Sequence, residues 1–159
     1  MQRPRHTSCS ASTETAEAIG AELRANGLRS TAARRLILST LRKAPDHPTV
    51  DELRTSLKAR GYGIGVATVY QNLARLAGAG LVTRFLDSQG LLRFDANRSR
   101  HHHLLCRSCG RIVDVDIGEQ ETERLSRVTN DLAIEHPSWK LEDAQLGLRG
   151  LCPACREAR

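Results

Sequence analysis

No stretch of the sequence qualifies as a membrane span. A helix that crosses a bilayer needs about 18 to 20 consecutive apolar residues, and the chain contains no apolar run of that length. The first 13 residues are polar and hold no hydrophobic core of a signal peptide. We therefore expect a cytoplasmic protein with no membrane partner.

Motifs of several common enzyme classes are also missing. The sequence has no Gly-rich nucleotide-binding loop and no Gly-x-Ser-x-Gly nucleophile elbow. A zinc deaminase would need Pro directly before the first Cys of a CxxC and an upstream His-x-Glu. Here Pro153 follows Cys152, and no His-x-Glu occurs. We therefore expect neither an enzymatic activity nor a small-molecule substrate.

The positive charge of the chain is concentrated in its first part. The net charge is +6 over 159 residues. Residues 1–94 carry 14 basic and 7 acidic side chains, whereas residues 95–159 carry 10 basic and 11 acidic ones. This asymmetry indicates that the first part meets a polyanion and that the second part has another role. The alternative is that scattered Arg residues only keep the protein soluble.

Four of the five cysteines form two CxxC pairs, separated by 42 residues. Stable disulfides are disfavoured in a reducing compartment, so clustered cysteines favour metal ligands or redox groups. Two pairs fill the four positions of a tetrahedral zinc and leave none for a substrate, so the expected site is structural. The ligands are Cys106, Cys109, Cys152 and Cys155. A dithiol redox switch is the alternative, and Cys9, alone in the polar start, is read as a spectator.

Apolar periodicity and helix start and stop signals predict four helices in the first part. The predicted helices run from Thr15 to Leu23, from Ser30 or Thr31 to Lys43, from Val50 to the stop at Gly61, and through Val66, Val69, Leu73 and Leu76. Thr49 and Glu52 have the spacing of a capping box at the start of the third helix. Residues 81–86 and 91–95 then predict a hairpin around residues 87–90.

A helical bundle followed by a two-stranded wing indicates a winged helix-turn-helix, in which the fourth helix enters the DNA major groove. The candidate base-reading side chains lie opposite the apolar face of that helix: Thr68, Gln71, Asn72 and Arg75. The alternative is an ordinary small helical bundle with a terminal hairpin, in which Arg75 is simply solvated.

The second part is predicted to be a small α+β domain. Strands are expected at residues 101–106, 112–116 and 144–151, with Leu146 and Leu148 alternating in the last. A helix is expected at residues 119–134, with Leu125, Val128 and Leu132 on its buried face. The predicted organisation is an N-terminal arm at 1–13, a winged helix at 14–94, a hinge at 95–100 and a metal-binding domain at 101–159.

Three consecutive histidines precede the first CxxC pair. Residues two apart on a strand share a face, so His101 and His103 are expected to point together while His102 points away. Asp95 and Asp114 lie nearby in the sequence. This pattern predicts a second metal site, made of imidazole nitrogen and carboxylate oxygen.

The ordered motifs resemble the ferric uptake regulator (Fur) superfamily over about residues 17–155. They are Gly-Val-Ala-Thr-Val-Tyr at 65–70, Arg-Phe-Asp at 93–95, His-x-His-Leu-Leu-Cys-x-x-Cys-Gly at 101–110 and the second CxxC. The resemblance implies a metal-dependent repressor of metal homeostasis or peroxide stress genes, built from a winged helix and a zinc-containing dimerisation domain. It also implies a homodimer that closes on an inverted-repeat operator in double-stranded DNA.

The same resemblance implies a regulatory site with ligands His47, Asp95, His101, His103 and Asp114. The set contains no sulfur, which suits Fe(II) or Mn(II), although imidazole and carboxylate also bind zinc. Zinc-sensing relatives commonly have a Cys near the position of Asp95, so the iron, peroxide or manganese branches are favoured. Asp114 resembles the peroxide-sensing type. The alternative within the superfamily is a zinc-uptake regulator, and the alternative outside it is a zinc-storing or redox-buffering protein without specific DNA binding.

A third metal site of the superfamily fits the sequence poorly. His102 and Glu121 match it, but Arg100 stands where a His is needed, and a second His is missing near Ala144. We expect this site to be absent, or remodelled with Glu142 or Asp143 as substitutes.

For DNA contacts, the resemblance places Tyr70 against a thymine edge, Arg29 in or near the minor groove and Arg34 on a phosphate. From the residues alone, Tyr70 lies at the edge of the apolar face of its helix and could simply pack there.

Overall fold

The computed structural model describes residues 15–141 and 144–158. The predicted arm at 1–13, Cys9, Glu142 and Asp143 lie outside the described residues. The chain divides into two compact units between Ser99 and Arg100, which we call the N-terminal unit and the C-terminal unit. A hinge at 95–100 stays a prediction.

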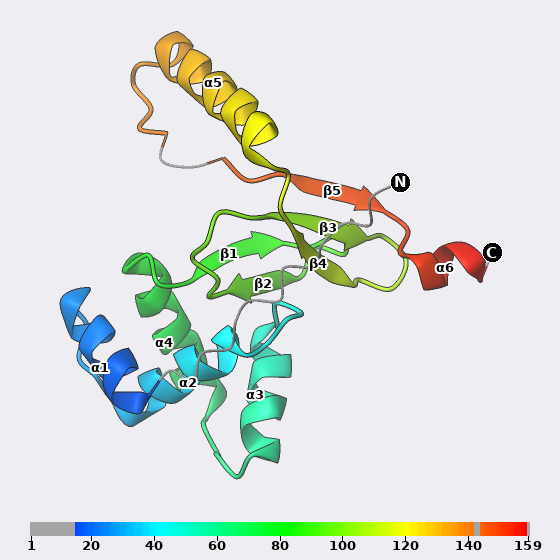
Figure 1. The fold of residues 1–159 in the computed structure, drawn as a ribbon. Helices are drawn as coiled ribbons and strands as arrows, with labels where there is room; N and C mark the ends of the chain where they lie inside the picture. The colour runs from blue at the N-terminus through cyan, green and yellow to red at the C-terminus, as the bar shows by residue number, and fades with distance from the viewer. Residues whose placement is uncertain (1–14, 142–143, 159) are drawn as a thin grey trace. The chain divides into compact units, whose positions relative to one another are not determined.

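The N-terminal unit consists of four helices and a hairpin (Figure 1). Its elements are α1 (Ala16–Ala25), α2 (Ala32–Arg42), α3 (Val50–Ala59), α4 (Val66–Gly78), β1 (Thr83–Leu86) and β2 (Leu92–Asp95). The two strands pair antiparallel, with Phe85 opposite Arg93. All four predicted helices and the predicted hairpin are therefore present.

Threonine hydroxyls begin the first three helices. Thr15, Thr31 and Thr49 each accept a hydrogen bond from a backbone amide of the first turn. The capping box predicted at α3 is confirmed, because the Glu52 amide donates to Thr49 Oγ1 at 3.3 Å and the Thr49 amide donates to Glu52 Oε2 at 2.8 Å. Substituting such a cap by Ala typically costs about 1 kcal/mol.

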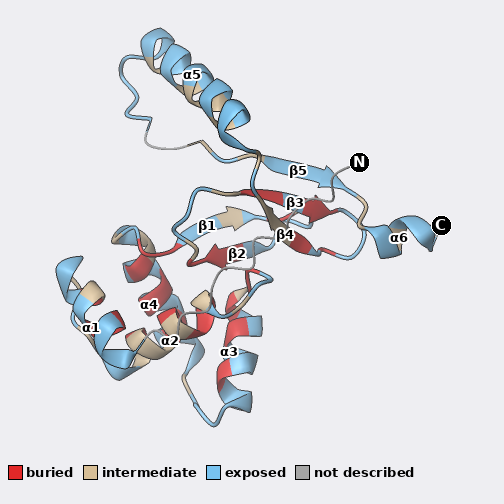
Figure 2. Ribbon diagram, in the orientation of Figure 1, coloured by how far each residue is buried: buried red, intermediate tan, exposed pale blue. Residues whose placement is uncertain are grey.

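Apolar side chains from every helix of the N-terminal unit and from β2 meet in one core. Leu23, Ile37, Leu53 and Leu73 are at most 1% exposed within it, and Phe94 of β2 closes it. Figure 2 shows the buried residues concentrated along α2, α3 and α4. This core fixes the orientation of α4 and of the loop before α3.

The C-terminal unit is α+β, as predicted (Figure 1). Its elements are β3 (His102–Cys106), β4 (Ile112–Val115), α5 (Glu119–Glu135), β5 (Gly147–Gly150) and α6 (Pro153–Glu157). The sheet has the order β4-β3-β5, in which β3 pairs antiparallel with β4 and parallel with β5. The short helix α6 was not predicted, and the last strand is shorter than the predicted 144–151.

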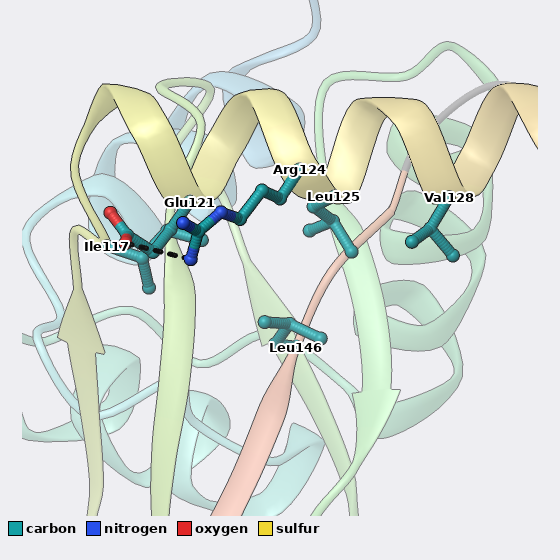
Figure 3. Close-up of a pocket in the computed structure, with 6 residues that line it drawn as sticks. All are labelled: Ile117, Glu121, Arg124, Leu125, Val128 and Leu146. Atoms are coloured by element: carbon teal, nitrogen blue, oxygen red, sulfur yellow. Dashed lines mark ion pairs between the residues drawn. The ribbon is translucent and has the colours of Figure 1, made fainter.

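The predicted buried face of α5 is wrong. No residue of this helix is buried, and Val128 and Leu132 are 53% and 42% exposed. Leu125 is half-buried and borders a shallow groove with Val128 and Leu146 (Figure 3). The apolar periodicity is present, but within the described residues nothing covers this face.

None of the described helices is long and apolar enough to cross a membrane.

Candidate metal centres and candidate nucleic-acid interface

The four cysteines of the CxxC pairs converge in the C-terminal unit. Cys106 ends β3, Cys109 lies in the following turn, Cys152 precedes α6 and Cys155 lies within it. The parallel pairing of β3 with β5 brings the pairs together, since Cys106 is in register with Gly150. Ligand atoms of the four residues all lie within 4.8 Å of one another. The convergence predicted from the spacing is therefore observed.

The sulfur positions fit tetrahedral zinc. Zn–S bonds of about 2.3 Å give sulfur–sulfur edges of about 3.8 Å, and the Sγ atoms of Cys109 and Cys152 are 3.7 Å apart. None of the four forms a disulfide. Four protein sulfurs leave no position for a substrate, so this is a structural centre.

Backbone amides prepare one of these thiols for metal binding. The amides of Cys109, Cys152 and Ser108 lower the pKa of Cys106 to about 6, and the Cys152 amide donates to its Sγ at 3.4 Å. The opposite shift occurs at Cys155: the Ser108 hydroxyl lowers its pKa, but Cys152 and Cys109 raise it to about 11. Four crowded thiols therefore cannot all ionise without a cation, which is the charge a zinc ion supplies.

A second group of ligand-type side chains lies in the same unit, at the other end of β3. The Nε2 atoms of His101 and His103 are 3.2 Å apart. Asp114 of β4 is opposite His103 in the ladder, and its Oδ1 lies 3.6 Å from His103 Nε2. Two imidazole nitrogens about 2.1 Å from a metal lie about 3.0 to 3.4 Å apart. The two imidazoles therefore have the spacing of ligands to one metal ion, and the Asp114 carboxylate lies beside them.

The third group lies in the N-terminal unit. His47 Nε2 is 3.5 Å from Asp95 Oδ2, and both side chains are at most 5% exposed. The His47 ring contacts Phe85 edge-on, with 5.6 Å between ring centroids. The backbone of His47 is left-handed, with φ of 49°. A residue with a Cβ is strained there, and such strain clusters at functional sites.

The two residues predicted for a third site do not form a ligand group. His102 is buried, and its Nδ1 accepts a hydrogen bond from the Leu146 amide at 3.1 Å. Glu121 is exposed, with Oε1 3.8 Å from Arg124 (Figure 3). Neither belongs to a group of three or more potential metal ligands among the described residues. The absence or remodelling of this site stays a prediction, since Glu142 and Asp143 lie outside that range.

Helix α4 presents a polar face to solvent, with one correction. Thr68, Tyr70, Gln71 and Arg75 are exposed, and Tyr70 is 53% exposed rather than packed. Asn72 was expected on the same face, but that prediction is wrong, because it is only 8% exposed. Its backbone position is helical, yet its side chain turns toward α2.

Asn72 is buried because its side chain accepts a hydrogen bond from the buried guanidinium of Arg34. Its Oδ1 accepts from Arg34 Nε at 3.1 Å, and its Nδ2 donates to the Thr68 carbonyl at 2.8 Å. Arg34 is 3% exposed and also donates from Nη1 to the Arg29 carbonyl. Burial, together with the charges of Arg75 and Arg29, lowers the pKa of Arg34. Arg29 itself is exposed, and a phosphate contact by Arg34 stays a prediction.

The role of one buried residue, which contacts the loop that carries His47, was not predicted. Arg93 of β2 is 8% exposed and contacts Asp87, Glu52 and the His47 carbonyl. The signal was available, since Arg93 and Asp95 are two apart on one strand and share a face.

The comparisons with known proteins point to one family. The model of the ferric uptake regulator family matches residues 25–146 of the chain. The peroxide-responsive repressor PerR of Staphylococcus epidermidis is 33% identical over 138 residues, which cover 86% of this chain and 87% of that protein. The ferric uptake regulator of Vibrio cholerae has a similar fold, with a TM-score of 0.66 and 30% identity over 84% of this chain and 98% of that one. The Pseudomonas aeruginosa regulator, solved with manganese, has a TM-score of 0.65 and 29% identity over 84% and 97%.

Proposed function

Because the chain belongs to the ferric uptake regulator family, we propose that one iron or manganese ion switches its affinity for DNA. Family membership makes the protein a metal-dependent transcriptional repressor with an N-terminal DNA-binding domain and a C-terminal dimerisation domain. The proposal concerns the ligands and the switch. The ligands are His47, Asp95, His101, His103 and Asp114.

The observation that carries the proposal is the presence of a partial ligand group in each unit. His47 and Asp95 supply one nitrogen and one oxygen from the N-terminal unit, 3.5 Å apart. His101, His103 and Asp114 supply two nitrogens and a carboxylate from the C-terminal unit. A metal bound by both groups would restrict the units to one arrangement, and loss of the metal would release it.

The donor atoms decide which metals suit this site. Nitrogen and oxygen ligands without sulfur suit Fe(II) and Mn(II), whereas the thiolates of the structural centre suit zinc. When bound, iron would also supply the reactivity by which a peroxide can oxidise a neighbouring imidazole. Similarity to a peroxide-responsive repressor supports peroxide as the signal, and we propose that signal for this chain.

The proposed DNA partner is a double-stranded inverted repeat. Each α4 would enter the major groove and present Thr68, Tyr70, Gln71 and Arg75, with Arg29 beside the minor groove. A homodimer places two such helices on half-sites one helical turn apart, about 34 Å. The exposed apolar face of α5 and the groove beside Leu146 support a second copy of this chain as the partner.

Proteins of this family regulate transcription rather than catalyse reactions. We propose that this chain likewise has no enzymatic activity. A repressor acts where the chromosome is, so the compartment we propose is the cytoplasm.

Binding to a selected operator tests the switch. The operator is first obtained by selection from random duplexes with Mn(II)-loaded protein. A mild chelator then removes the loosely held metal while metal analysis confirms one zinc per chain, and anisotropy measures binding at fixed salt. We expect affinity to fall at least tenfold without metal and to return with Mn(II) or Fe(II).

Two variants sharpen this test. His47→Ala should abolish the return of affinity, whereas His136→Ala, an exposed histidine at the end of α5, should not. Unchanged affinity after metal removal would reject the switch. Recovery with Zn(II) alone would reject the choice of metal.

A further inference from the structure

The three residues of the Arg-Phe-Asp motif all hold the loop that carries His47. Arg93 Nη1 donates to the His47 carbonyl in a long contact of 3.5 Å. The Phe94 amide donates to the Pro48 carbonyl at 3.2 Å. The Asp95 carboxylate lies 3.5 Å from His47 Nε2. Consecutive positions of β2 thus attach to this loop by a side chain, by the backbone and by a second side chain.

The guanidinium of Arg93 joins two further parts of the N-terminal unit to this loop. Its Nε donates to Asp87 Oδ2 at 2.9 Å, and its Nη1 donates to Glu52 Oε2 at 2.7 Å. Asp87 begins the turn of the β1–β2 hairpin, and Glu52 is the acidic residue of the α3 capping box. One buried cation therefore ties the wing turn, the start of α3 and the loop together.

Asp87 in turn organises the wing. Its Oδ1 accepts hydrogen bonds from the Gln89 amide at 2.8 Å and the Leu91 amide at 3.0 Å. Its side chain is fully buried, and a buried carboxylate needs a paired cation and hydrogen-bond donors to stay charged. Arg93 supplies that cation, so the order of the wing turn and the position of the His47 loop depend on the same side chain.

The left-handed backbone of His47 shows why the loop needs such support. A residue with a Cβ does not hold φ near 49° unless its surroundings fix it. The two backbone attachments to β2 lie at the His47 carbonyl and at the Pro48 carbonyl, directly after this position, and the Asp95 carboxylate lies beside the imidazole. These contacts hold the His47 imidazole beside Asp95.

We propose that Arg93 is a positioning residue, which holds His47 and Asp95 ready for the regulatory metal and couples that site to the wing turn through Asp87. The inference rests on the proposed function, in which His47 and Asp95 are ligands. It follows that metal binding at this loop and order at residues 87–91 should rise and fall together.

The test compares Arg93 with an exposed arginine on the same hairpin. The variants are Arg93→Gln and Arg93→Lys, with Arg84→Gln on β1 as the matched control. Lys keeps the charge but lacks the planar fork that reaches two carboxylates at once. Co(II) is titrated into zinc-loaded, chelator-treated protein, and its visible absorption reports both affinity and ligand geometry.

We expect Arg93→Gln to weaken Co(II) binding at least tenfold and to alter the spectrum, while zinc content stays at one per chain. Arg93→Lys should retain the fold and still lose most of the affinity. Hydrogen exchange at the Gln89 and Leu91 amides should accelerate in both variants and slow in the wild type when Co(II) is added. A merely structural role would change the melting temperature but not the spectrum.

His47→Ala distinguishes a failure of the positioning role from a failure of the ligand set. If His47→Ala abolishes Co(II) binding while Arg93→Gln keeps wild-type affinity and spectrum, the positioning role is rejected and the ligand set stands. If His47→Ala leaves Co(II) binding unchanged, the ligand set fails and this inference fails with it.

Discussion

Each of the two units of this chain is stabilised internally in a different way. In the N-terminal unit, fifteen hydrophobic residues from four helices and the wing form one buried cluster. Among the described residues of the C-terminal unit, the buried hydrophobics are only Leu105, Cys106 and Ile112. Figure 2 shows α5, β5 and α6 almost entirely exposed or half-exposed.

The difference in buried core shows that a small unit needs another source of stability. A unit of about 60 residues gains little stability from apolar burial alone. The C-terminal unit has a four-cysteine centre and a helix with an uncovered apolar face. These features suit the two usual substitutes for a core, a structural metal and a second subunit. We therefore expect the units to respond to different perturbations.

Loss of zinc should produce the largest effect. Structural zinc contributes roughly 10 to 16 kcal/mol of apparent folding free energy, so Cys106→Ser should unfold the C-terminal unit while α1–α4 stay folded. Peptide-resolved hydrogen exchange measures both units in one sample. Cys9→Ser is the matched control, and equal protection of β3 and β5 in the two variants would contradict this expectation.

A core truncation should destabilise the N-terminal unit instead of the C-terminal unit. Leu53 is 0% exposed in the N-terminal core, so Leu53→Ala should cost about 2 to 5 kcal/mol of unfolding free energy in that unit. Denaturant unfolding followed by circular dichroism measures it.

The matched change on α5 is Leu132→Ala, at a position that is 42% exposed. It should alter the stability of the monomer by no more than about 0.5 kcal/mol but weaken subunit association, as measured by sedimentation. A Leu132→Ala protein as destabilised as Leu53→Ala, with association unchanged, would show that α5 packs within its own chain.

Within α4, buried and exposed polar residues should also differ. Asn72→Ala leaves the buried Arg34 Nε without its acceptor, which should cost about 1.5 to 3 kcal/mol of stability. Arg75→Ala should leave the melting temperature nearly unchanged and reduce the salt dependence of DNA binding by about one counterion. The opposite assignment of these two effects would mean that the polar face of α4 has been misidentified.

The smallest expected effect is a pH dependence confined to the N-terminal unit. Burial raises the pKa of Asp87, but hydrogen bonds from Leu91, Arg93 and Gln89 outweigh it and lower the pKa below the ordinary 3.8. A lowered folded pKa adds stability above the unfolded pKa, and this is lost as pH falls through the folded value. Asp87→Asn should therefore flatten the acid decline of stability below about pH 4, whereas the exposed Asp51→Asn should leave it unchanged.

Local patterns predicted much of this molecule. The capping box at Thr49 and the convergence of the cysteine pairs depend on spacing along the chain, and both are observed. Burial of Asn72 depends on Arg34 in another helix, which the periodicity of α4 alone cannot reveal. The apolar stripe of α5 was predicted correctly as a pattern, but a pattern does not say whether its own chain or another covers it.

Strand β3 has a consequence for how the protein is assembled. It carries His103 near one end and Cys106 at the other, about 10 Å apart at 3.3 Å per residue. His103 is paired with Gly147 of β5, and the four thiolates bring together the segments that follow these two strands. We therefore expect zinc loading to come first, and zinc starvation to remove the proposed response to the second metal however abundant that metal is.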